Sequence, residues 1–336
     1  MIRVAINGFG RIGRNVFKAS FGRLKDIEFV AVNDLTDTKT LAHLLKHDTN
    51  YGTYEREVSH DDKNIIVDGH KVLVTAEKDP TKLPWKDLNI DVVIESTGRF
   101  TDEKGAGQHL TAGAKRVVLS APAKGGNIPT YVFGVNADDY KGEAMIINNA
   151  SCTTNCIAPV AQVMHSVFGV KKAMMTTIHS YTADQVLQDG PHKDLRRGRA
   201  AAMNMVPTST GAAIAVTETI PELKGLFDGF SMRVPTSVVS CSDFTFLLAK
   251  KTTALEVNAA IKKACDSKRY MGIMGYTEEP LVSSDFIKNP LSSIVDLELT
   301  QVVDGDMVKV VAWYDNEWGY SNRLGEMVVA VGNAIK

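Results

Sequence analysis

The sequence predicts an α/β protein in which a doubly wound parallel sheet is followed by an α+β domain with a largely antiparallel sheet. Three observations predict this fold. At 336 residues the chain exceeds the size of one ordinary core, so two domains are expected. In the first third, short Val- and Ile-rich runs alternate with helical segments, and from about residue 170 the β-rich runs become longer.

The alternation in the first third indicates parallel strands. Parallel neighbours need long crossover connections, which are usually helices, and helical patterns at residues 11–21 and 38–46 supply the first two. The runs expected as strands are "IRVAI", "IEFVAV", "DVVIEST", "RVVLS" and "YVFGV".

The second part of the chain has a different pattern. Its β-rich runs are separated by helical stretches such as residues 254–267, which is typical of an α+β domain, and a closing helix is expected from Tyr320 to Ile335. The long runs are "AMMTTIHSYT", "FSMRVPTSVVSCSDFTFLLA" and "DMVKVVAWYD".

The first predicted strand leads directly into a glycine motif, Gly8-x-Gly10-x-x-Gly13, which opens a helix. The next strand ends at Asp34, about 20 residues beyond the glycines. Glycines allow a tight turn and close backbone approach, a helix N-terminus attracts a pyrophosphate, and the acid can accept hydrogen bonds from a ribose. A glycine turn beside a surface aspartate is the plainer alternative. The order of the elements favours a Rossmann-type dinucleotide site, and the Asp34 carboxylate favours NAD over NADP.

Charge and hydropathy exclude several kinds of protein. Lys and Arg number 38 against 39 Asp and Glu, so the net charge of -1 provides no general field for nucleic acid or anionic lipid. An anionic ligand must therefore be held by local charge. No segment approaches the roughly 18 consecutive apolar residues of a membrane span. The N-terminal run contains Arg3 and Asn7 and is interpreted as a strand, not as a signal peptide, so the cytoplasm is the default compartment.

The four cysteines form neither a disulfide framework nor a C-x-x-C metal site, so reduced thiols and no bound metal are expected. Cys152 follows a predicted strand at residues 145–149 and begins a predicted helix, where a thiolate is favoured. Cys156, one turn later, is interpreted as a small buried residue. The spacing alone leaves packing open for Cys152 too. A nearby base would decide the matter, and the candidates in the sequence are His165, His179 and His192.

Seven segments carry a resemblance to a known family: "INGFGRIGR", "ASCTTNC", "HSYTADQ", "STGAA", "MRVPT", "GYTEEPLVSSDF" and "WYDNEWGYSNR". In this order and at these separations they closely resemble the phosphorylating glyceraldehyde-3-phosphate dehydrogenases, over essentially the whole chain. The resemblance implies oxidation of D-glyceraldehyde 3-phosphate to 1,3-bisphosphoglycerate with NAD and inorganic phosphate, in glycolysis or gluconeogenesis. It implies a hemithioacetal and a thioester on Cys152, with His179 activating the thiol, and it implies a homotetramer.

The resemblance also implies domains and ligand-binding residues. An NAD-binding domain is expected over residues 1–150, completed by a C-terminal helix at 317–336, with a catalytic domain at 151–316. The expected cofactor-binding residues are Gly8, Gly10, Arg11, Ile12, Gly13, Asp34, Lys78, Ser120, Asn316 and Tyr320. The expected residues for inorganic phosphate are Ser151, Thr153, Thr210 and Gly211, and those for the substrate phosphate are Thr182, Arg197 and Arg233.

At two places the family's residue roles cannot be assigned directly to this sequence. Lys78 stands where many relatives carry an arginine, and a lysine cannot reproduce the planar stacking of a guanidinium on the adenosine. Arg196, Arg197 and Arg199 lie in one basic loop, and at least one of the three is expected to be simply solvated.

Two other functions compete with this interpretation. Erythrose-4-phosphate dehydrogenases share the cysteine, the histidine and the glycines, but the segments "NDLTD" and "STGAA" favour glyceraldehyde 3-phosphate. A redox sensor that signals through oxidation of Cys152 is a secondary role at most, because the chain carries the full catalytic set.

Overall fold

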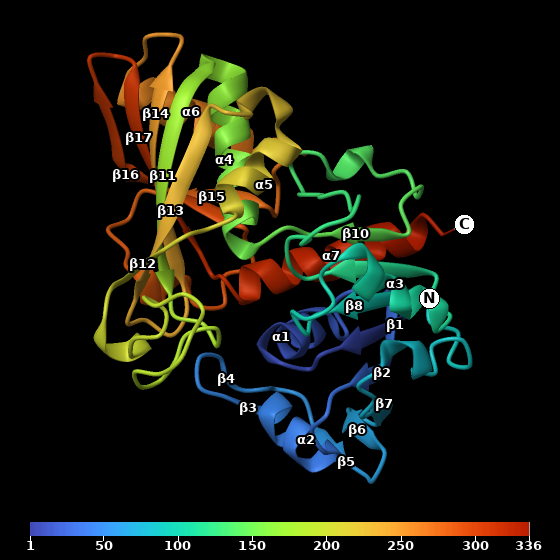
Figure 1. Ribbon diagram of the computed structural model, residues 1–336. Coiled ribbons are helices and arrows are strands. Elements are labelled where there is room, and N and C mark those ends of the chain that lie inside the picture. The colour runs from blue at the N-terminus through green and yellow to red at the C-terminus, as the bar shows by residue number, and fades with distance from the viewer. Residues whose placement is uncertain (336) are drawn as a thin grey trace. The chain divides into compact units, whose positions relative to one another are not determined.

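The computed structural model describes residues 1–335, which divide into two compact units. Unit 1 comprises Met1–Tyr131, Asp139–Ala150 and the C-terminal segment from Ser321, and unit 2 comprises Val132–Asp138 and Ser151–Tyr320. Each unit is built on one large sheet (Figure 1).

Unit 1 contains an eight-stranded sheet with the order β10-β9-β8-β1-β2-β7-β6-β5. All neighbours from β10 to β7 are parallel, and β6 and β5 add an antiparallel edge. The predicted doubly wound parallel sheet is therefore confirmed. Its strands are β1 (Ile2–Asn7), β2 (Ile27–Asn33), β5 (Val58–His60), β6 (Asn64–Val67), β7 (His70–Thr75), β8 (Val92–Glu95), β9 (Arg116–Leu119) and β10 (Ile146–Asn148), with β3 (His47–Asp48) and β4 (Gly52–Thr53) as a separate pair.

Helices pack on both faces of this sheet, which explains why β1 is apolar along most of its length. On one face Ile6 meets helix α1, where a side chain on Gly13 would touch it. On the other face Ala5 and Val93 form a buried cluster with Trp85. The helices of this unit are α1 (Arg11–Ser20), α2 (Thr38–Lys46), α3 (Glu103–Thr111) and most of α7 (Trp318–Asn333), with a 3-10 turn at Pro80–Lys82. A further 3-10 turn, Ala137–Asp139, lies where the chain passes from unit 2 back into unit 1.

Unit 2 contains a seven-stranded sheet with the order β12-β13-β11-β14-β17-β16-β15, in which only the pairs β11–β13 and β15–β16 are parallel. The predicted largely antiparallel sheet is confirmed. Its strands are β11 (Val170–Ser180), β12 (Val206–Thr208), β13 (Phe227–Val234), β14 (Ser240–Leu248), β15 (Met274–Thr277), β16 (Ser293–Val303) and β17 (Met307–Tyr314). Its helices are α4 (Cys152–Phe168), α5 (Ala212–Thr219) and α6 (Ala254–Cys265), with 3-10 turns at Ala201–Met203, Pro221–Leu223 and Ser283–Phe286.

Strand β11 shows how this sheet divides its two faces. Ala173, Met175, Thr177 and His179 are buried, whereas Met174 between them is exposed. This period of two is the expected pattern for a strand with one covered face. His179 therefore points to the buried side of the sheet.

One strand prediction was wrong, and one β-rich run forms two strands. The run "YVFGV" at 131–135 forms a turn, because the Val132 carbonyl accepts the N–H groups of Val135 and Asn136, and Gly134 has a φ of 79°. The long run starting at Phe230 is divided into β13 and β14 around Pro235, which cannot donate to a strand ladder.

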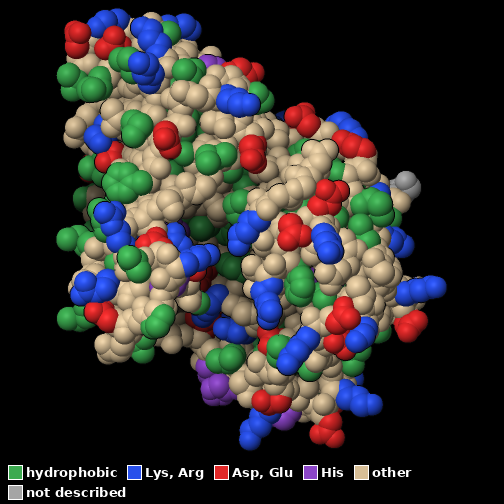
Figure 2. Space-filling model, in the orientation of Figure 1, with side chains coloured by type: hydrophobic (Ala, Val, Ile, Leu, Met, Phe, Trp, Pro, Cys, Tyr) green, Lys and Arg blue, Asp and Glu red, His purple; other side chains and the backbone are tan. Residues whose placement is uncertain are grey.

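The described helices include none that is long and apolar enough to cross a membrane. On the face drawn in Figure 2, Lys and Arg side chains alternate with Asp and Glu side chains. This mixture agrees with the balanced charge of the sequence.

The approach of helix α1 to the sheet predicts a sharp cost at one glycine. A Cβ on Gly13 would lie 2.2 Å from the Gly8 carbonyl oxygen. We expect Gly13→Ala to lower the midpoint of thermal unfolding by at least about 2 °C, since overpacking costs on the order of 1–3 kcal/mol. The matched control is Gly107→Ala in α3, where a Cβ would meet no atom within 4 Å. That variant is expected to unfold at an equal or higher temperature. Equal midpoints for both variants would contradict this account of the packing.

Candidate active site

Cys152 is the first residue of helix α4. The preceding Ser151 caps the helix, because its hydroxyl oxygen accepts the Thr154 N–H at 3.0 Å. Ala150, just before the cap, has a φ of 55°, an uncommon conformation for alanine that turns the chain sharply into the helix. The thiol thus lies at a helix N-terminus, where the dipole favours a negative charge.

His179 is the histidine that approaches this thiol. Its Nε2 lies 3.6 Å from Cys152 Sγ, and its Nδ1 lies 2.7 Å from the Ser180 carbonyl oxygen. Arg233 Nη1 also lies 3.0 Å from this Nδ1, but it donates to the same Ser180 carbonyl at 3.0 Å. The carbonyl can only accept and its contact with Nδ1 is the shorter one, so we assign the ring proton to Nδ1, which donates it. Nε2 is then the acceptor that faces the thiol, which is the tautomer that a general base requires.

Burial disfavours both charged forms of this pair, the thiolate of Cys152 and the imidazolium of His179. Burial and, to a lesser extent, the nearby Arg233 guanidinium together lower the pKa of His179 to about 3. Burial also raises the pKa of the Cys152 thiol, although Arg233 and the hydroxyl and N–H of Thr153 act in the opposite direction. The two groups are therefore expected to share one proton over a broad pH range. Moving that proton from sulfur to nitrogen creates two opposite charges, whose attraction is about 4 kcal/mol at an effective dielectric constant near 20.

The hydroxyl of Tyr314 holds the two elements of this pair together. It lies 2.9 Å from Thr153 Oγ1 in α4 and 2.8 Å from Thr177 Oγ1 in β11, and the tyrosine is 1% exposed. No sequence pattern favours this role over ordinary aromatic packing. Tyr314 lies between Trp313 and Trp318 in the sequence, and the partners of its hydroxyl are known only when the pairing of the strands is known.

Arg233 lies beside His179 because β11 and β13 are parallel and these two residues are register partners. Its Nη1 donates to the Ser180 carbonyl at 3.0 Å and lies 3.5 Å from the Thr182 hydroxyl. Arg233 and Thr182, both predicted to bind the substrate phosphate, are therefore neighbours.

Arg197 is distinguished from the other two arginines of its loop. Its Nε donates to Thr208 Oγ1 at 2.8 Å, and its guanidinium pairs with Asp184. Its charge also lowers the pKa of His179. Arg196 is exposed, and Arg199 pairs with Asp189 at the surface. Of the three, Arg197 alone has an electrostatic effect on the catalytic pair among the described contacts.

The predicted residues for inorganic phosphate lie at two helix starts. Ser151 and Thr153 begin α4, and the Thr153 hydroxyl is occupied by Tyr314. Thr210 and Gly211 precede α5, where Thr210 Oγ1 accepts the Ala212 N–H at 3.2 Å.

Asn316 follows strand β17 in unit 2 and is 5% exposed. Its Oδ1 accepts the hydroxyls of Ser180 and Ser240, each at 3.0 Å. These two serines were missed by the sequence analysis. They fix the amide so that its NH₂ group points the other way, which suits donation to a ligand carbonyl. Tyr320, in the first turn of α7, is buried.

Unit 1 contains a cavity of about 650 Å³ at the glycine motif. Of the predicted residues, Gly8, Gly10, Asp34 and Lys78 line it. Gly8 has a φ of 92°, and a side chain there would come within 2.7 Å of the Thr97 nitrogen. Gly10, the N-cap of α1, offers no side-chain acceptor to the helix. Wall residues that the sequence analysis missed are Asn7, Asn33, Leu35, Glu77, Ser96, Thr97, Arg99 and Phe100.

Other predicted cofactor residues are outside this lining. Arg11 extends to Asp48, with 2.7 Å between Nη1 and Oδ2. Ile12 and Gly13 lie in α1, and Ser120 follows β9, where its N–H donates to the Glu95 carbonyl.

The remaining histidines and cysteines are engaged elsewhere. Nδ1 of His165 accepts the Val170 N–H at 3.2 Å, and Nδ1 of His192 accepts the Asp194 N–H at 2.9 Å. Cys156 is fully buried, as predicted, and burial raises its pKa to about 12. All four cysteines are free, and no cluster of three potential metal ligands occurs within residues 1–335.

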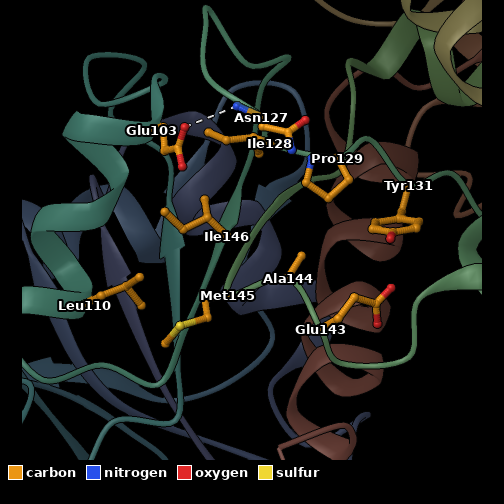
Figure 3. Close-up of a pocket in the computed structure, with 10 residues that line it drawn as sticks. All are labelled: Glu103, Leu110, Asn127, Ile128, Pro129, Tyr131, Glu143, Ala144, Met145 and Ile146. Atoms are coloured by element: carbon orange, nitrogen blue, oxygen red, sulfur yellow. Dashed lines mark hydrogen bonds between the residues drawn. The ribbon is translucent and has the colours of Figure 1, made fainter.

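A second cavity in unit 1, of about 590 Å³, is drawn in Figure 3. Its walls are mostly apolar, with Glu103 at one end, where the carboxylate accepts the Asn127 N–H at 3.2 Å, and Glu143 at the other. None of the predicted site residues is among the ten described residues that line it.

Comparison with known proteins agrees with this geometry. Residues 2–103 match the model of the NAD binding domain of glyceraldehyde 3-phosphate dehydrogenase, and residues 151–316 match the model of its C-terminal domain. The chain belongs to the glyceraldehyde-3-phosphate dehydrogenase family. The NAD binding match includes Asp34 and most of the 650 Å³ cavity, and the C-terminal match includes Cys152, His179 and Arg233.

Full-length relatives support the same assignment. The glyceraldehyde-3-phosphate dehydrogenase of Geobacillus stearothermophilus is 54% identical over 333 residues, which cover 99% of this chain and 98% of the relative. That of Streptomyces coelicolor is 53% identical over 335 residues, or 99% of both chains. Glyceraldehyde-3-phosphate dehydrogenase 1 of Bacillus cereus is 54% identical over 328 residues, or 97% of both chains.

The shared proton predicts the pH dependence of Cys152 alkylation. Protonating the pair requires acid near the lowered pKa of His179, about 3, and removing its proton requires base above the usual thiol pKa, which burial raises. Labelling by iodoacetamide is therefore expected to change little between about pH 5 and 8. In His179→Asn the rate should instead rise about tenfold per pH unit, as for a simple thiol.

Peptide mapping identifies the labelled residue, and Cys156→Ser serves as the matched control with an unchanged profile. Faster labelling of Cys156 than of Cys152, or the same pH profile in His179→Asn, would refute the pairing.

Proposed function

We propose that this chain catalyses the oxidation of D-glyceraldehyde 3-phosphate to 1,3-bisphosphoglycerate with NAD and inorganic phosphate. The observation that carries the proposal is the 3.6 Å contact between Cys152 Sγ and His179 Nε2 at a helix N-terminus, in a chain of the glyceraldehyde-3-phosphate dehydrogenase family. NAD dependence follows from the family.

The cavity of unit 1 fits a dinucleotide. It joins a glycine turn, an uncapped helix start at Gly10 and the Asp34 carboxylate. Asp34 accepts the N–H groups of Phe9 and Thr36, and its remaining lone pairs can accept from ribose hydroxyls. When bound, NAD accepts the hydride that the oxidation releases. In unit 2, Ser180 and Ser240 occupy Oδ1 of Asn316, so its amide N–H would be the group that donates to the carboxamide of the nicotinamide.

The first step is attack by Cys152 on the aldehyde. His179 Nε2 takes the thiol proton, and the sulfur forms a bond to the carbonyl carbon. The proton then passes from His179 to the carbonyl oxygen, which gives a hemithioacetal. The N–H groups at the start of α4 stabilise the negative charge that develops on the oxygen.

His179 acts again in the oxidation. It takes the hydroxyl proton of the hemithioacetal while the carbon loses a hydride, and a thioester on Cys152 remains. The sulfur thereby conserves the energy of oxidation for transfer to phosphate.

Phosphate binding completes the proposal. Arg233, Thr182 and Arg197 hold the phosphate of the substrate by charge-assisted hydrogen bonds. Ser151, Thr153, Thr210 and Gly211, at the starts of α4 and α5, hold inorganic phosphate. Attack of this phosphate on the thioester breaks the carbon–sulfur bond, releases the acyl phosphate and returns the thiolate.

We also propose that the chain forms a homotetramer in the cytoplasm. Between β11 and β12, the side chains of Leu187, Leu195, Met203 and Met205 are each exposed by 74% or more, which favours burial against other subunits. The four free cysteines suit a reducing compartment.

Glyceraldehyde 3-phosphate is favoured over erythrose 4-phosphate because the relatives described above carry the former in their names. Redox signalling through Cys152 would be secondary to catalysis.

We expect steady NADH formation from glyceraldehyde 3-phosphate to require inorganic phosphate. Without it, one rapid burst of NADH per active subunit should be followed by slow hydrolysis, since the thioester lacks its acceptor. Initial rates with glyceraldehyde 3-phosphate, erythrose 4-phosphate and no substrate, each with and without phosphate, provide the measurement. Full turnover without phosphate would indicate a hydrolysing aldehyde dehydrogenase, and a higher kcat/KM for erythrose 4-phosphate would favour the other dehydrogenase.

We expect NAD to be preferred over NADP, because the Asp34 carboxylate would repel a 2′-phosphate. Asp34→Asn should lower the ratio of kcat/KM with NAD to kcat/KM with NADP by roughly tenfold or more, since it removes that repulsion. The matched control is Asp37→Asn, which alters the N-cap of α2 outside the cavity lining. Equal use of both cofactors by the unmodified protein would show that Asp34 does not select the cofactor.

A further inference from the structure

Polar side chains at the ends of four neighbouring strands form a row of hydrogen bonds, here named the carboxyl-edge ladder. It consists of Glu95 at the end of β8, Asn7 at the end of β1, Asn33 at the end of β2 and Thr75 at the end of β7. Each is the register partner of the next.

The ladder has one consistent set of donors and acceptors. Asn7 Nδ2 donates to Glu95 Oε2 at 2.6 Å, and Asn7 Oδ1 accepts from Asn33 Nδ2 at 2.7 Å. Asn33 Oδ1 accepts from Thr75 Oγ1 at 2.9 Å. Both faces of each amide are thereby assigned, so neither Asn7 nor Asn33 can rotate without breaking a bond.

The outer end of the ladder is fixed by His109 and Trp85. His109 Nε2 lies 2.9 Å from Glu95 Oε2, and both side chains are 0% exposed. The Trp85 indole N–H donates to His109 Nδ1 at 3.0 Å. Because an indole nitrogen can only donate, Nδ1 carries no proton, and Nε2 must donate to Glu95.

Glu95 therefore accepts four donors. Besides Asn7 and His109 at Oε2, its Oε1 accepts the N–H of Thr97 at 2.8 Å and the Thr97 hydroxyl. A fully buried carboxylate is costly in a protein interior unless it is satisfied in this way. The apolar core of the sheet alone gives no reason to place it there.

The ladder reaches the wall of the cofactor cavity. Asn7, Asn33 and Thr97 line the cavity, together with Gly8 and Asp34. Glu95, His109 and Trp85 do not belong to the described lining but hold those residues from behind. Thr97 in particular is held where a side chain on Gly8 would strike it.

We propose that Glu95 and His109 are positioning residues for the dinucleotide: through Asn7 and Thr97 they hold the cavity in the shape that binds NAD. This inference rests on the NAD site of the proposed function. Glu95 and His109 would then affect the affinity for the cofactor through the residues of the cavity wall, without touching the cofactor themselves.

The direct test is Glu95→Gln, which keeps the shape but turns one acceptor oxygen into an NH₂ group that faces other donors. We expect the Kd for NAD, measured by calorimetry, to rise at least about tenfold, as for the loss of a hydrogen bond to a charged group. The KM for NAD should rise in parallel. The kcat at saturating NAD and the KM for the aldehyde should stay within about twofold, because the catalytic pair is untouched. The matched control, Glu103→Gln, alters a carboxylate on the separate cavity of Figure 3 and should bind NAD as the unmodified protein does.

A merely structural role gives a different result. It would lower the midpoint of thermal unfolding while the folded variant bound NAD with a Kd less than about tenfold above that of the unmodified protein, and this outcome overturns the proposal. If Glu95→Gln does not fold, the proposal is tested with Trp85→Phe. It removes the donor to His109 Nδ1 and should raise the Kd for NAD about threefold or more, with loss of the single Nε2–H tautomer in ¹⁵N NMR of the His109 ring. A smaller rise overturns the proposal. Failure of the unmodified protein to bind NAD would instead refute the proposed function.

Discussion

The contact between Cys152 and His179 depends on one constraint: the first turn of α4 must stay fixed against the ends of β11 and β17. The Tyr314 hydroxyl provides it by bonding to Thr153 on the helix and Thr177 on the strand, inside a fully packed interior. A shift of the helix by the length of one hydrogen bond would separate sulfur from imidazole. The reactivity of the thiol is thus a property of how the helix is attached to the sheet, and the dipole of the helix adds to it.

The topology of the sheet in unit 2 places Arg233 and Asn316 near His179, at the end of β11. The sheet of unit 2 is mostly antiparallel, but β11 and β13 are parallel, and this exception makes Arg233 the register partner of His179. The next residue on β11, Ser180, offers its carbonyl to both His179 and Arg233 and its hydroxyl to Asn316. One strand end therefore sets the tautomer of His179, places the Arg233 guanidinium beside it and orients the Asn316 amide. In the proposed function these groups serve as the base, a cation for phosphate and a donor to the nicotinamide. In unit 1 the ends of parallel strands do the same for the cofactor cavity.

Much of this was predictable from the sequence where local pattern decides structure. The glycine spacing, the acid after the second strand and the cysteine at a helix start each have a local physical cause, and the structure contains all three features. Long-range pairing was not predictable in that way. The roles of Tyr314, Ser180 and Ser240 depend on which strands are neighbours, and the carboxyl-edge ladder joins residues 7 and 95. The strand predicted at 131–135 was wrong. Val and Phe favour a strand locally, but Gly134 and the Val132 carbonyl form a turn.

We expect Cys152, and no other cysteine, to carry the acyl group during turnover. The most direct measurement is mass spectrometry of peptides from protein quenched in acid after mixing with glyceraldehyde 3-phosphate and NAD in the absence of phosphate. A phosphoglyceroyl thioester should be found on the peptide that contains Cys152, located on that residue by fragmentation and lost when phosphate is added before quenching. An acyl group on Cys156, Cys241 or Cys265, or NADH formation without any acylated cysteine, would contradict this expectation.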